Sequence, residues 1–509
     1  MSLFTANNSF TQQISHYEIE ITFSPPTGRL RCHASVLLTA EKNCSDFYFV
    51  LGDFCEVETV CYLGLPLIFK KRKLSGQQNL LKIKLPRKAD IGEKLTLTFT
   101  YTGALKPSDS RGCINTELCE LPPESNWYPA VPGIQKYTAN ITVITPGPMR
   151  IIATGNMAEE KRLDTRYQTH WASGVPGSGL HIVAGQFNRT ERKGLAVYYP
   201  RPLVNQARSL ANSGEKIVEH LKQLLGEHPA GECTLIIIEQ ERPEAHVSTQ
   251  LNTISSGLLA RETTEKNTRE KQIVLFRMAA RELGRRWLEA ALPSQNPADT
   301  WYLTALAEYT SWMLVEAEYG VEVRNQIMAE AKLNAKYAGS IHSACSRFPS
   351  LPDWLLSKGS WLMRIVHCAL GNQFYPLIQE VFSQHDRTAP EAKVFFSLLA
   401  QKAGTNFDHL YHEWVVSSRK LILELDAPRT FTDENGQWQL VFSLVNRGKL
   451  RWQNEVEMQL ISEDGSKELK KFTISNEPFL ISSPSRVTEI EIDPQRKLLN
   501  WAKTTKYTV

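Results

Sequence analysis

The 509-residue sequence lacks the features that mark membrane-spanning and secreted proteins. No uninterrupted apolar run approaches the ~18 to 20 residues needed to cross a bilayer. The first residues, MSLFTANNSFTQQ, have neither the basic start nor the apolar stretch of a signal peptide. Nine cysteines occur without any C-x-x-C spacing; Cys113 and Cys119 could pair, but free thiols are favoured. We therefore expect a cytoplasmic protein without a transmembrane segment.

Excess charge and familiar catalytic motifs are also scarce. The formal net charge is +4, which is small for this length and gives no reason to expect nucleic acid or an anionic membrane as the partner. The twelve histidines include no i, i+4 pair, and His409 with His412 is a spacing more typical of surface or packing positions. No G-x-S-x-G elbow, P-loop or G-x-G-x-x-G after a strand is present, so these common catalytic classes have no support.

The hydrophobic period changes twice along the chain and predicts a multidomain α+β protein. Short alternating runs such as HYEIEITF and KLTLTFTYTG predict an N-terminal β-sandwich-like domain, residues 1–197. Helical spacing dominates the next segment, 198–427, apart from the apolar strand CTLIIIEQ. After Asp426-Ala427-Pro428 the period returns to two, which predicts a small C-terminal β-sandwich over 428–509 with DENG and EDGS as hairpin turns.

One helical stretch of the middle domain, RMAARELGRRWLEA (278–291), has the frame of a metal-binding helix. In the motif His-Glu-x-x-His, positions i and i+4 lie on one helix face, so both imidazoles can bind one zinc ion while the glutamate deprotonates its water. Here Arg281 and Arg285 hold the two histidine positions, and Glu282 holds the general-base position. Arginine stays protonated and offers no lone pair, so it cannot replace a histidine ligand.

RELGRRW followed by WYLTALAEY resembles the gluzincin alanyl-aminopeptidase family, whose signature is HELAHQW and then WLNEGFASY. The second segment matches at Trp301, Ala307 and Tyr309. This alignment puts Thr304 at the third zinc-ligand position, 19 residues after Arg285. The resemblance implies a thermolysin-like domain over 198–427 that has lost all three zinc ligands.

Other segments resemble the same family in the same order. LNTISSGLL resembles the Gly-x-Met-Glu-Asn stretch that binds the substrate amine, with Ile254 at the position of the amine-anchoring glutamate. LLSKGSWLMRIV resembles the segment with the oxyanion-stabilising tyrosine, and Leu356 stands at that tyrosine's position. GSGLHIVAGQF, NFDHLYHEWV and IEIDPQRKLL also resemble family segments. The departures therefore fall on positions that the family's reaction needs.

We interpret the chain as a catalytically inactive aminopeptidase-like protein that has no metal or cofactor and binds a peptide or protein in the former cleft. An active hydrolase with a rebuilt site using Glu282 is the alternative, and a purely structural subunit is a third. The residues Arg281, Glu282 and Arg285, with Arg286, could be a solvated helix face. Alternatively, an arginine could replace the lost zinc by pairing with Glu282 and hydrogen-bonding Thr304, or the arginines could bind an anionic ligand. Glu308, one turn beyond Thr304, is a further candidate acid, although it would make a poor zinc site without imidazoles.

Overall fold

The computed structural model describes most of the chain in two compact units. The described residues are 11–74, 77–105, 112–131, 135–147, 149–192, 194–228, 233–248, 250–264, 266–292, 300–345, 352–385 and 389–509. The first unit comprises Met1–Leu303 and Gln379–Pro390, and the second comprises Thr304–Ile378 and Glu391–Val509. The predicted boundaries after residues 197 and 427 stay predictions.

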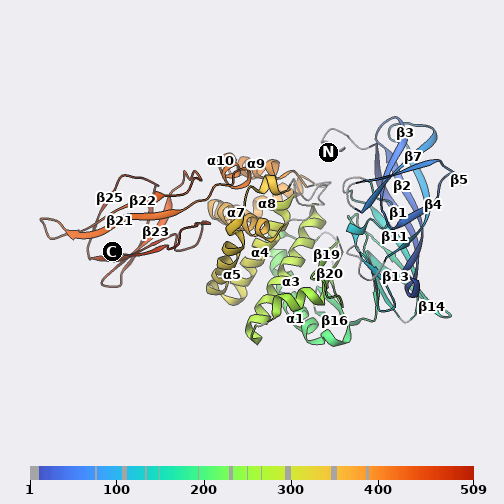
Figure 1. Ribbon diagram of the computed structural model, residues 1–509, viewed down its shortest axis with the longest axis horizontal. Helices are drawn as coiled ribbons and strands as arrows, with labels where there is room; N and C mark the ends of the chain where they lie inside the picture. The colour runs from blue at the N-terminus through green and yellow to red at the C-terminus, as the bar shows by residue number, and fades with distance from the viewer. Residues whose placement is uncertain are drawn as a thin grey trace. The chain divides into compact units, whose positions relative to one another are not determined.

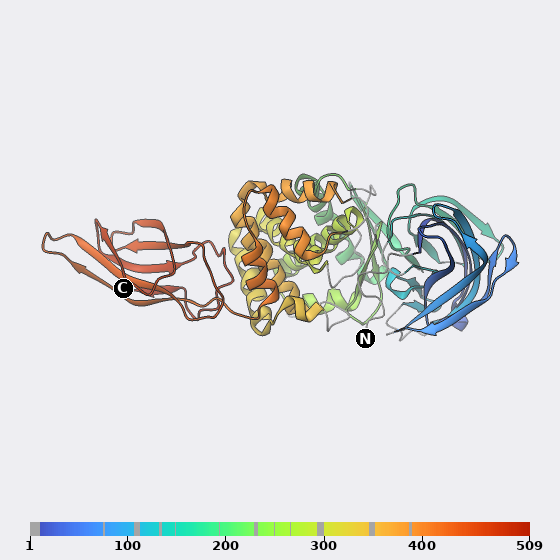
Figure 2. The same cartoon turned by 90° about the horizontal axis from the view of Figure 1, so that it is seen from above.

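The first unit begins with three β-sheets that lie together in Figures 1 and 2. Their strands are β1 Gln12–Ser24, β2 Arg29–Ala40, β3 Cys44–Gly52, β4 Cys55–Tyr62, β5 Leu65–Pro66, β6 Phe69–Lys73, β7 Gln78–Ala89, β8 Lys94–Ala104, β9 Cys113–Ile114, β10 Leu118–Leu121, β11 Thr138–Pro146, β12 Arg150–Ala153, β13 Asn156–Leu163, β14 Arg166–Ala172 and β15 Ile182–Gly185. The sheet orders are β13-β14-β11-β1-β2-β8-β4-β5, β3-β7-β6 and β12-β15-β10-β9. Alternating apolar residues of these strands form one buried core, which confirms the β architecture expected for the N-terminal part.

The first strand is longer than its apolar pattern suggests. Alternation predicts a strand over HYEIEITF, yet β1 begins at Gln12. Gln12 is buried because its side chain bonds the neighbouring backbone: Nε2 donates to the Tyr48 carbonyl at 2.9 Å, and Oε1 accepts from the Tyr48 N–H at 3.0 Å. A buried amide with both groups satisfied costs little, so a polar residue extends the strand where hydrophobicity alone does not indicate one.

A five-stranded sheet and three helices complete the main part of the first unit. The elements are β16 Asn188–Arg192, β17 Leu195–Tyr199, α1 Val204–Leu225, β18 Cys233–Ile238, β19 Ala245–Val247, β20 Leu251–Ser255, α2 Ser256–Thr263 and α3 Thr268–Ala291. The sheet order is β16-β17-β18-β20-β19, with β17, β18 and β20 parallel and β19 an antiparallel edge strand. Helix α3 packs against α1, α2, β19 and β20. Helices α1 and α3 confirm the helical spacing of this part of the chain, and β18 confirms the strand predicted at CTLIIIEQ.

The second unit is helical and then β. Its helices are α4 Trp301–Tyr319, α5 Val321–Asn334, α6 Ile341–Cys345, α7 Asp353–Leu370, α8 Phe374–Ser383, α9 Ala392–Lys402 and α10 Asp408–Tyr411. The first residues of α4 and the last residues of α8 belong to the first unit. Its strands are β21 Leu423–Thr432, β22 Trp438–Asn446, β23 Val456–Ser462, β24 Lys467–Phe472, β25 Phe479–Ser483, β26 Val487–Ile492 and β27 Lys506–Thr508. The strands form two sheets, β21-β22-β25 and β24-β23-β26-β27. The turns at DENG and EDGS are hairpins, as predicted.

Two further expectations can be compared with the structure. All nine cysteines are free thiols, so Cys113 and Cys119 do not pair. Within the described ranges, no helix combines the length and the hydropathy that crossing a bilayer requires.

One glycine in the first unit is required by close packing. Gly257, in the first turn of α2, lies against the loop that follows β18, and a Cβ there would be 1.8 Å from the Glu241 carbonyl oxygen. The same loop is held by bonds from the Gly257 N–H to the Gln240 carbonyl at 2.8 Å and from Ser256 Oγ to that carbonyl at 3.0 Å. Because both sides of the contact are backbone, neither can yield by changing a rotamer.

We predict that Gly257→Ala lowers the free energy of unfolding by at least ~2 kcal/mol, because the added methyl forces the α2 turn and the 239–241 loop apart. Urea denaturation followed by circular dichroism measures this. Gly174→Ala is the control, since a Cβ at that position meets nothing within 4 Å. Equal midpoints for the two variants would contradict the packing argument.

Candidate functional site

Helix α3 is held firmly at both ends and in the middle. Asn267 caps it through a reciprocal capping box, in which the Glu270 N–H donates to Asn267 Oδ1 at 3.0 Å and the Asn267 N–H donates to Glu270 Oε2 at 2.9 Å. Near the other end, Trp287 Nε1 donates to the Gly226 carbonyl at 3.0 Å. In the middle, Asn252 Nδ2 on β20 donates to the Glu282 carbonyl at 2.8 Å. The position of Glu282 is therefore fixed relative to the sheet.

The carboxylate of Glu282 is bound by the two arginines beside it. Arg281 Nε lies 2.9 Å from Oε1, and Arg285 Nη1 lies 3.1 Å from Oε2, so each carboxylate oxygen accepts from a different guanidinium. Glu282 is 1% exposed, whereas the arginine side chains are 23% and 24% exposed. Charge-assisted bonds of this kind offset much of the cost of burying a carboxylate.

This burial contradicts the interpretation of the stretch as a solvated helix face. Glu282 and Arg286 are both buried, and only Arg281 and Arg285 retain partial exposure. The sequence alone cannot distinguish a solvated charged helix face from a buried one. The spacing of the charged residues is the same whether or not a sheet covers that face of the helix.

A second carboxylate extends the charged row along the helix. Glu289 Oε1 lies 3.6 Å from Arg285 Nη2. Burial raises the pKa of Glu289 to about 7; Arg285 opposes this rise, and the charges of Glu124 and Glu282 add to it. Burial lowers the pKa of Arg285, but Glu282 and Glu289 outweigh it and raise the value above the ordinary one. Arg285 therefore stays charged between two carboxyl groups.

A buried acid and histidine cluster lies in the same unit. Glu120 on β10 accepts from Thr253 Oγ1 at 2.8 Å, and its Oε1 lies 3.3 Å from His181 Nε2. Burial raises the pKa of Glu120, but the His181 bond and the charge of His246 outweigh it and lower the value. Three segments far apart in sequence thus meet at one ionised carboxylate.

His246 on the edge strand β19 links this cluster to α3. Its Nδ1 lies 3.5 Å from Glu124 Oε2, its Nε2 lies 3.8 Å from Glu244 Oε2, and its ring centroid is 6.4 Å from that of His181. Burial lowers the pKa of His246, but Glu124 and Glu244 raise it to about 10. Since the charge of Glu124 also acts on Arg285 and Glu289, the histidine cluster and the α3 row form one electrostatic network.

The residues of α3 do not suit the zinc ion that the resemblance implies. Two of the three ligand positions are arginines without a lone pair, and both oxygens of Glu282 are engaged by them. Across the part of the chain that the structure describes, no group of three or more His, Cys, Asp and Glu side chains is arranged to hold a metal ion.

The remaining predicted positions lie on three different elements. Ile254 is fully buried within β20, where it is paired with Ile237 on β18 and Ala245 on β19. Thr304 is the fourth residue of α4 and is partly buried, and Leu356 is partly buried in the first turns of α7. Thr304 and Leu356 belong to the second unit. The structure thus brings together Arg281, Glu282 and Arg285, while the bond from an arginine to Thr304 stays a prediction.

Three polar residues of the second unit make internal contacts. Glu308 Oε1 accepts from Trp312 Nε1 at 2.8 Å within α4. Tyr309 Oη lies 2.6 Å from His367 Nδ1. Lys358 is buried and donates to the Gly339 carbonyl at 2.9 Å, and burial lowers its pKa to about 8. Contacts within the protein therefore explain these three polar residues, and no ligand is needed to explain them.

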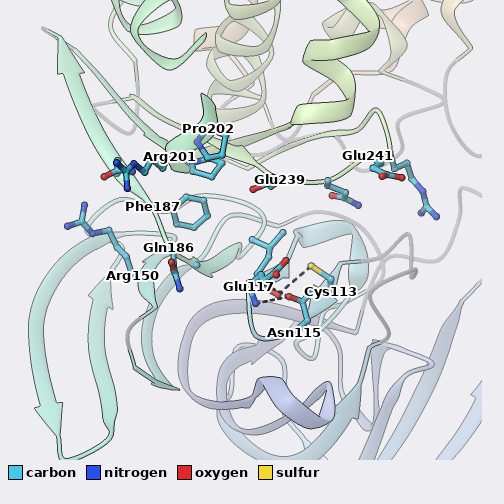
Figure 3. Close-up of a pocket in the computed structure, with 16 residues that line it drawn as sticks. Cys113, Asn115, Glu117, Arg150, Gln186, Phe187, Arg201, Pro202, Glu239 and Glu241 are labelled. Atoms are coloured by element: carbon cyan, nitrogen blue, oxygen red, sulfur yellow. Dashed lines mark hydrogen bonds between the residues drawn. The ribbon is translucent and has the colours of Figure 1, made fainter. Parts of the chain in front are cut away.

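A large open pocket of about 1140 Å³ lies elsewhere in the first unit (Figure 3). One wall is the β9–β10 turn with Asn115 and Glu117, and the facing wall carries Arg201 and the 239–242 loop. Its charged lining residues are of both signs: Glu117, Arg150, Arg201, Glu239, Glu241 and Arg242. None of the predicted site positions lines it, so this pocket is separate from the α3 network.

Comparisons with known proteins identify the fold. Aminopeptidase A of Legionella pneumophila, solved in complex with aspartic acid, matches with a TM-score of 0.76 and 14% sequence identity. The match covers 98% of this chain and 60% of that chain. No family model matches the sequence, and no curated protein matches it. The chain therefore has an aminopeptidase-like fold and spans about three fifths of the length of that aminopeptidase.

Sequence reasoning missed the Glu120, His181 and His246 cluster. The signals were weak: Glu120 lies within the short strand β10 and Glu124 follows it in CELPPE, while His246 stands in a short segment with no strand pattern. Only the pairing of β19 with β20 and of β10 with β15 brings these residues together.

We predict that Glu282→Gln lowers the free energy of unfolding by about 2–4 kcal/mol, since it removes the buried carboxylate that both partly buried arginines bind. Urea denaturation at neutral pH measures the loss. Glu262→Gln is the matched control, because Glu262 pairs with Arg261 at 2.8 Å on the surface of α2, and its loss should cost less than ~0.5 kcal/mol. Similar small effects for both variants would mean that the α3 pair contributes no more than an exposed one.

We also predict a pH dependence of stability that His246 causes. Because its folded pKa is about 10 and its unfolded value is 6.5, its contribution is complete below pH 6.5 and is lost as pH rises through 10. A shift of this size corresponds to about 5 kcal/mol without screening. Because the Glu124 side chain is 58% exposed and solvent screens its charge, we expect a loss on the order of 1–2 kcal/mol, measured as the difference between the unfolding free energies of wild type and His246→Gln at several pH values. The half-buried His220 on α1 supplies a control, His220→Gln. Parallel stability curves for wild type and His246→Gln would contradict the assignment.

Proposed function

We propose that this protein is a non-catalytic member of the gluzincin alanyl-aminopeptidase lineage that binds a peptide or protein segment beside α3. The observation that carries the proposal is the double ion pair of Glu282 with Arg281 and Arg285. A general base must have a free carboxylate oxygen for the water it deprotonates, and here guanidinium groups engage both oxygens. The aminopeptidase-like fold supports a peptidase-related origin.

The two arginines suit a binding role for a chemical reason. Each guanidinium donates to Glu282, Arg285 also lies 3.6 Å from Glu289, and about a quarter of each arginine side chain is exposed to solvent. A ligand carboxylate, such as a peptide C-terminus or an acidic side chain, could approach the two arginines from their exposed sides. The proposed occupant is therefore a peptide or protein segment with a carboxylate, and no cofactor takes part.

We predict that the purified protein retains no stoichiometric zinc and does not hydrolyse fluorogenic alanyl or leucyl amides. Elemental analysis and a fluorescence assay with and without chelator measure the two properties. One equivalent of zinc with chelator-sensitive turnover would overturn the proposal in favour of an active hydrolase. Zinc-independent turnover that Glu282→Gln abolishes would favour the rebuilt site using Glu282.

The triple variant Arg281→His, Arg285→His and Thr304→Glu tests the alignment in the same assay. If these are the family's three ligand positions, the variant should retain about one equivalent of zinc. The double histidine variant, which lacks the third ligand, is the matched control and should retain less.

Binding can be tested with phage-displayed random peptides selected on the wild-type protein. Arg285→Glu should weaken binding of the selected peptides at least tenfold, whereas Arg242→Glu in the separate pocket should leave it unchanged. The reverse result would move the binding site to the pocket in Figure 3. If no peptide binds, the structural-subunit interpretation would be favoured.

A further inference from the structure

The small net charge of the chain conceals one strongly basic segment. Residues 61–94 contain nine lysines and arginines and two acidic residues, a net charge of +7. Since the whole chain carries +4, the remaining residues carry −3. The segment forms the last residues of β4, then β5, β6 and β7, and reaches the first residue of β8. The positive charge of a molecule that is nearly neutral overall is therefore concentrated in one segment.

The same segment exposes its largest aliphatic side chains. Leu63 is 81% exposed, Leu65 is 69% exposed and Ile68 is 81% exposed. In contrast, Leu67 and Phe69 between and after them pack against the core of the β domain. The alternation anchors the chain through one set of residues and directs the other set into solvent. Apolar side chains with this exposure are unusual when they follow one another so closely.

Leu63 has a backbone conformation that is unfavourable for leucine. Leu63 and Gly64 have φ angles of 51° and 78°, and they join β4 to β5 in a two-residue hairpin where Tyr62 pairs with Leu65. Turns with two positive φ angles favour Asn, Asp and Gly, and a branched aliphatic residue is disfavoured there. Folding alone gives no reason for leucine at this position, because its side chain is in solvent.

Basic side chains lie beside these apolar ones. Strand β5 is an edge strand of the eight-stranded sheet and β6 is an edge strand of the three-stranded sheet, and residues 67–68 connect them. The Lys84 N–H donates to the Ile68 carbonyl at 3.3 Å, which places β7 next to the exposed aliphatic residues. On β6, Lys70 and Arg72 are exposed, with Lys70 opposite Lys82 of β7. We call Leu63, Leu65, Ile68, Lys70, Arg72 and Lys84 the edge patch.

Most nearby acids are already paired with other basic residues. Asp46 lies 2.7 Å from Lys82 Nζ, and Glu93 is bound by Arg87. Lys73 Nζ lies 3.9 Å from Asp53, and Lys71 Nζ donates to the Cys55 carbonyl at 3.4 Å. Within the residues that the structure describes, Lys70, Arg72 and Lys84 make no ion pair. Their charge is therefore available to an external anion.

We propose that the edge patch docks the protein reversibly on an anionic lipid bilayer, with the aliphatic tip among the headgroups and the lysines and arginine against lipid phosphates. A short apolar tip beside unpaired basic groups has the two components that peripheral membrane binding requires, burial of apolar area and electrostatic attraction. The whole-chain charge gives no indication of this surface because the rest of the molecule compensates it.

Edge lysines alone have another explanation. Charged residues on an edge strand prevent sheets from joining edge to edge, and β6 is an edge strand. That role would be served by lysines without exposed leucines and is weakened by them, since an apolar tip promotes self-association. A second copy of the chain is also a poorer occupant because the unpaired charges on the patch are of one sign and would repel their copies.

Flotation with vesicles tests the proposal on the full chain. The wild-type protein should bind vesicles of phosphatidylcholine mixed with phosphatidylglycerol and not vesicles of phosphatidylcholine alone, and the binding should weaken as ionic strength rises. Lys70→Gln with Arg72→Gln should lower the partition coefficient about 25-fold, since each charge near an anionic surface contributes about fivefold. Leu65→Asn with Ile68→Asn should lower it at least ~10-fold.

Leu63→Asn separates membrane binding from folding. Asparagine suits the positive φ angle better than leucine, so the urea midpoint should stay the same or rise, while vesicle binding should fall about 3- to 10-fold. Two controls should bind like wild type: Leu333→Asn, an exposed leucine on α5, and Lys467→Gln with Lys471→Gln, exposed lysines on β24.

Five outcomes would overturn the proposal. Wild-type protein could fail to bind anionic vesicles at low ionic strength, or bind neutral vesicles equally well. The edge-patch variants could bind as wild type does. Sedimentation could reveal dimers that Leu65→Asn with Ile68→Asn dissociates in the absence of vesicle binding, which would make a second copy the occupant. Finally, binding to a homopolymeric RNA that depends on Lys70 and Arg72, without vesicle binding, would assign the patch to another polyanion.

Discussion

The ion pairs of Glu282 with Arg281 and Arg285 are the constraint on which the middle of α3 depends. A buried carboxylate is costly unless charge and hydrogen bonds offset the loss of water, and here each oxygen has its own guanidinium. The backbone at the same residue is also fixed, since its carbonyl accepts from Asn252 of β20. The charged side chains and the helix-to-sheet contact therefore stabilise one another, and neither can change without a cost to the other.

A pair of arginines differs from a metal ion in what it allows. A metal ion accepts lone pairs and leaves a position for water, whereas a guanidinium donates hydrogen bonds in a fixed plane and leaves none. The charge here is also spread along a row in which Arg285 lies between Glu282 and Glu289, and Glu124 connects that row to His246. Such an alternating network holds its own members in place, which suits recognition of an added carboxylate better than transfer of a proton.

The parts of the fold that follow a period could be predicted, and the parts that depend on distant partners could not. Helices α1 and α3, strand β18 and the two C-terminal hairpins have strong local patterns, and they were found where expected. Strands β16 and β19 are short and have no pattern, so they exist only through pairing with β17 and β20. At the site, Arg281, Glu282 and Arg285 are near in sequence and could be grouped. Glu120 and His181 could not, because 61 residues separate them and only sheet topology joins them.

The net charge of the whole chain does not indicate the basic segment either. Net charge describes interactions at distances much longer than the molecule, but a docking surface is felt within a Debye length of about 8 Å at physiological ionic strength. A segment of +7 therefore acts as a basic surface even when the rest of the chain carries −3. The conformation of Leu63 points the same way, since a leucine with φ of 51° in solvent is worse for folding than asparagine would be. At Leu63, and at the arginines in place of metal ligands, the residue present is not the one that local stability or the family's chemistry favours. Selection for a property other than stability is the simplest explanation of such residues.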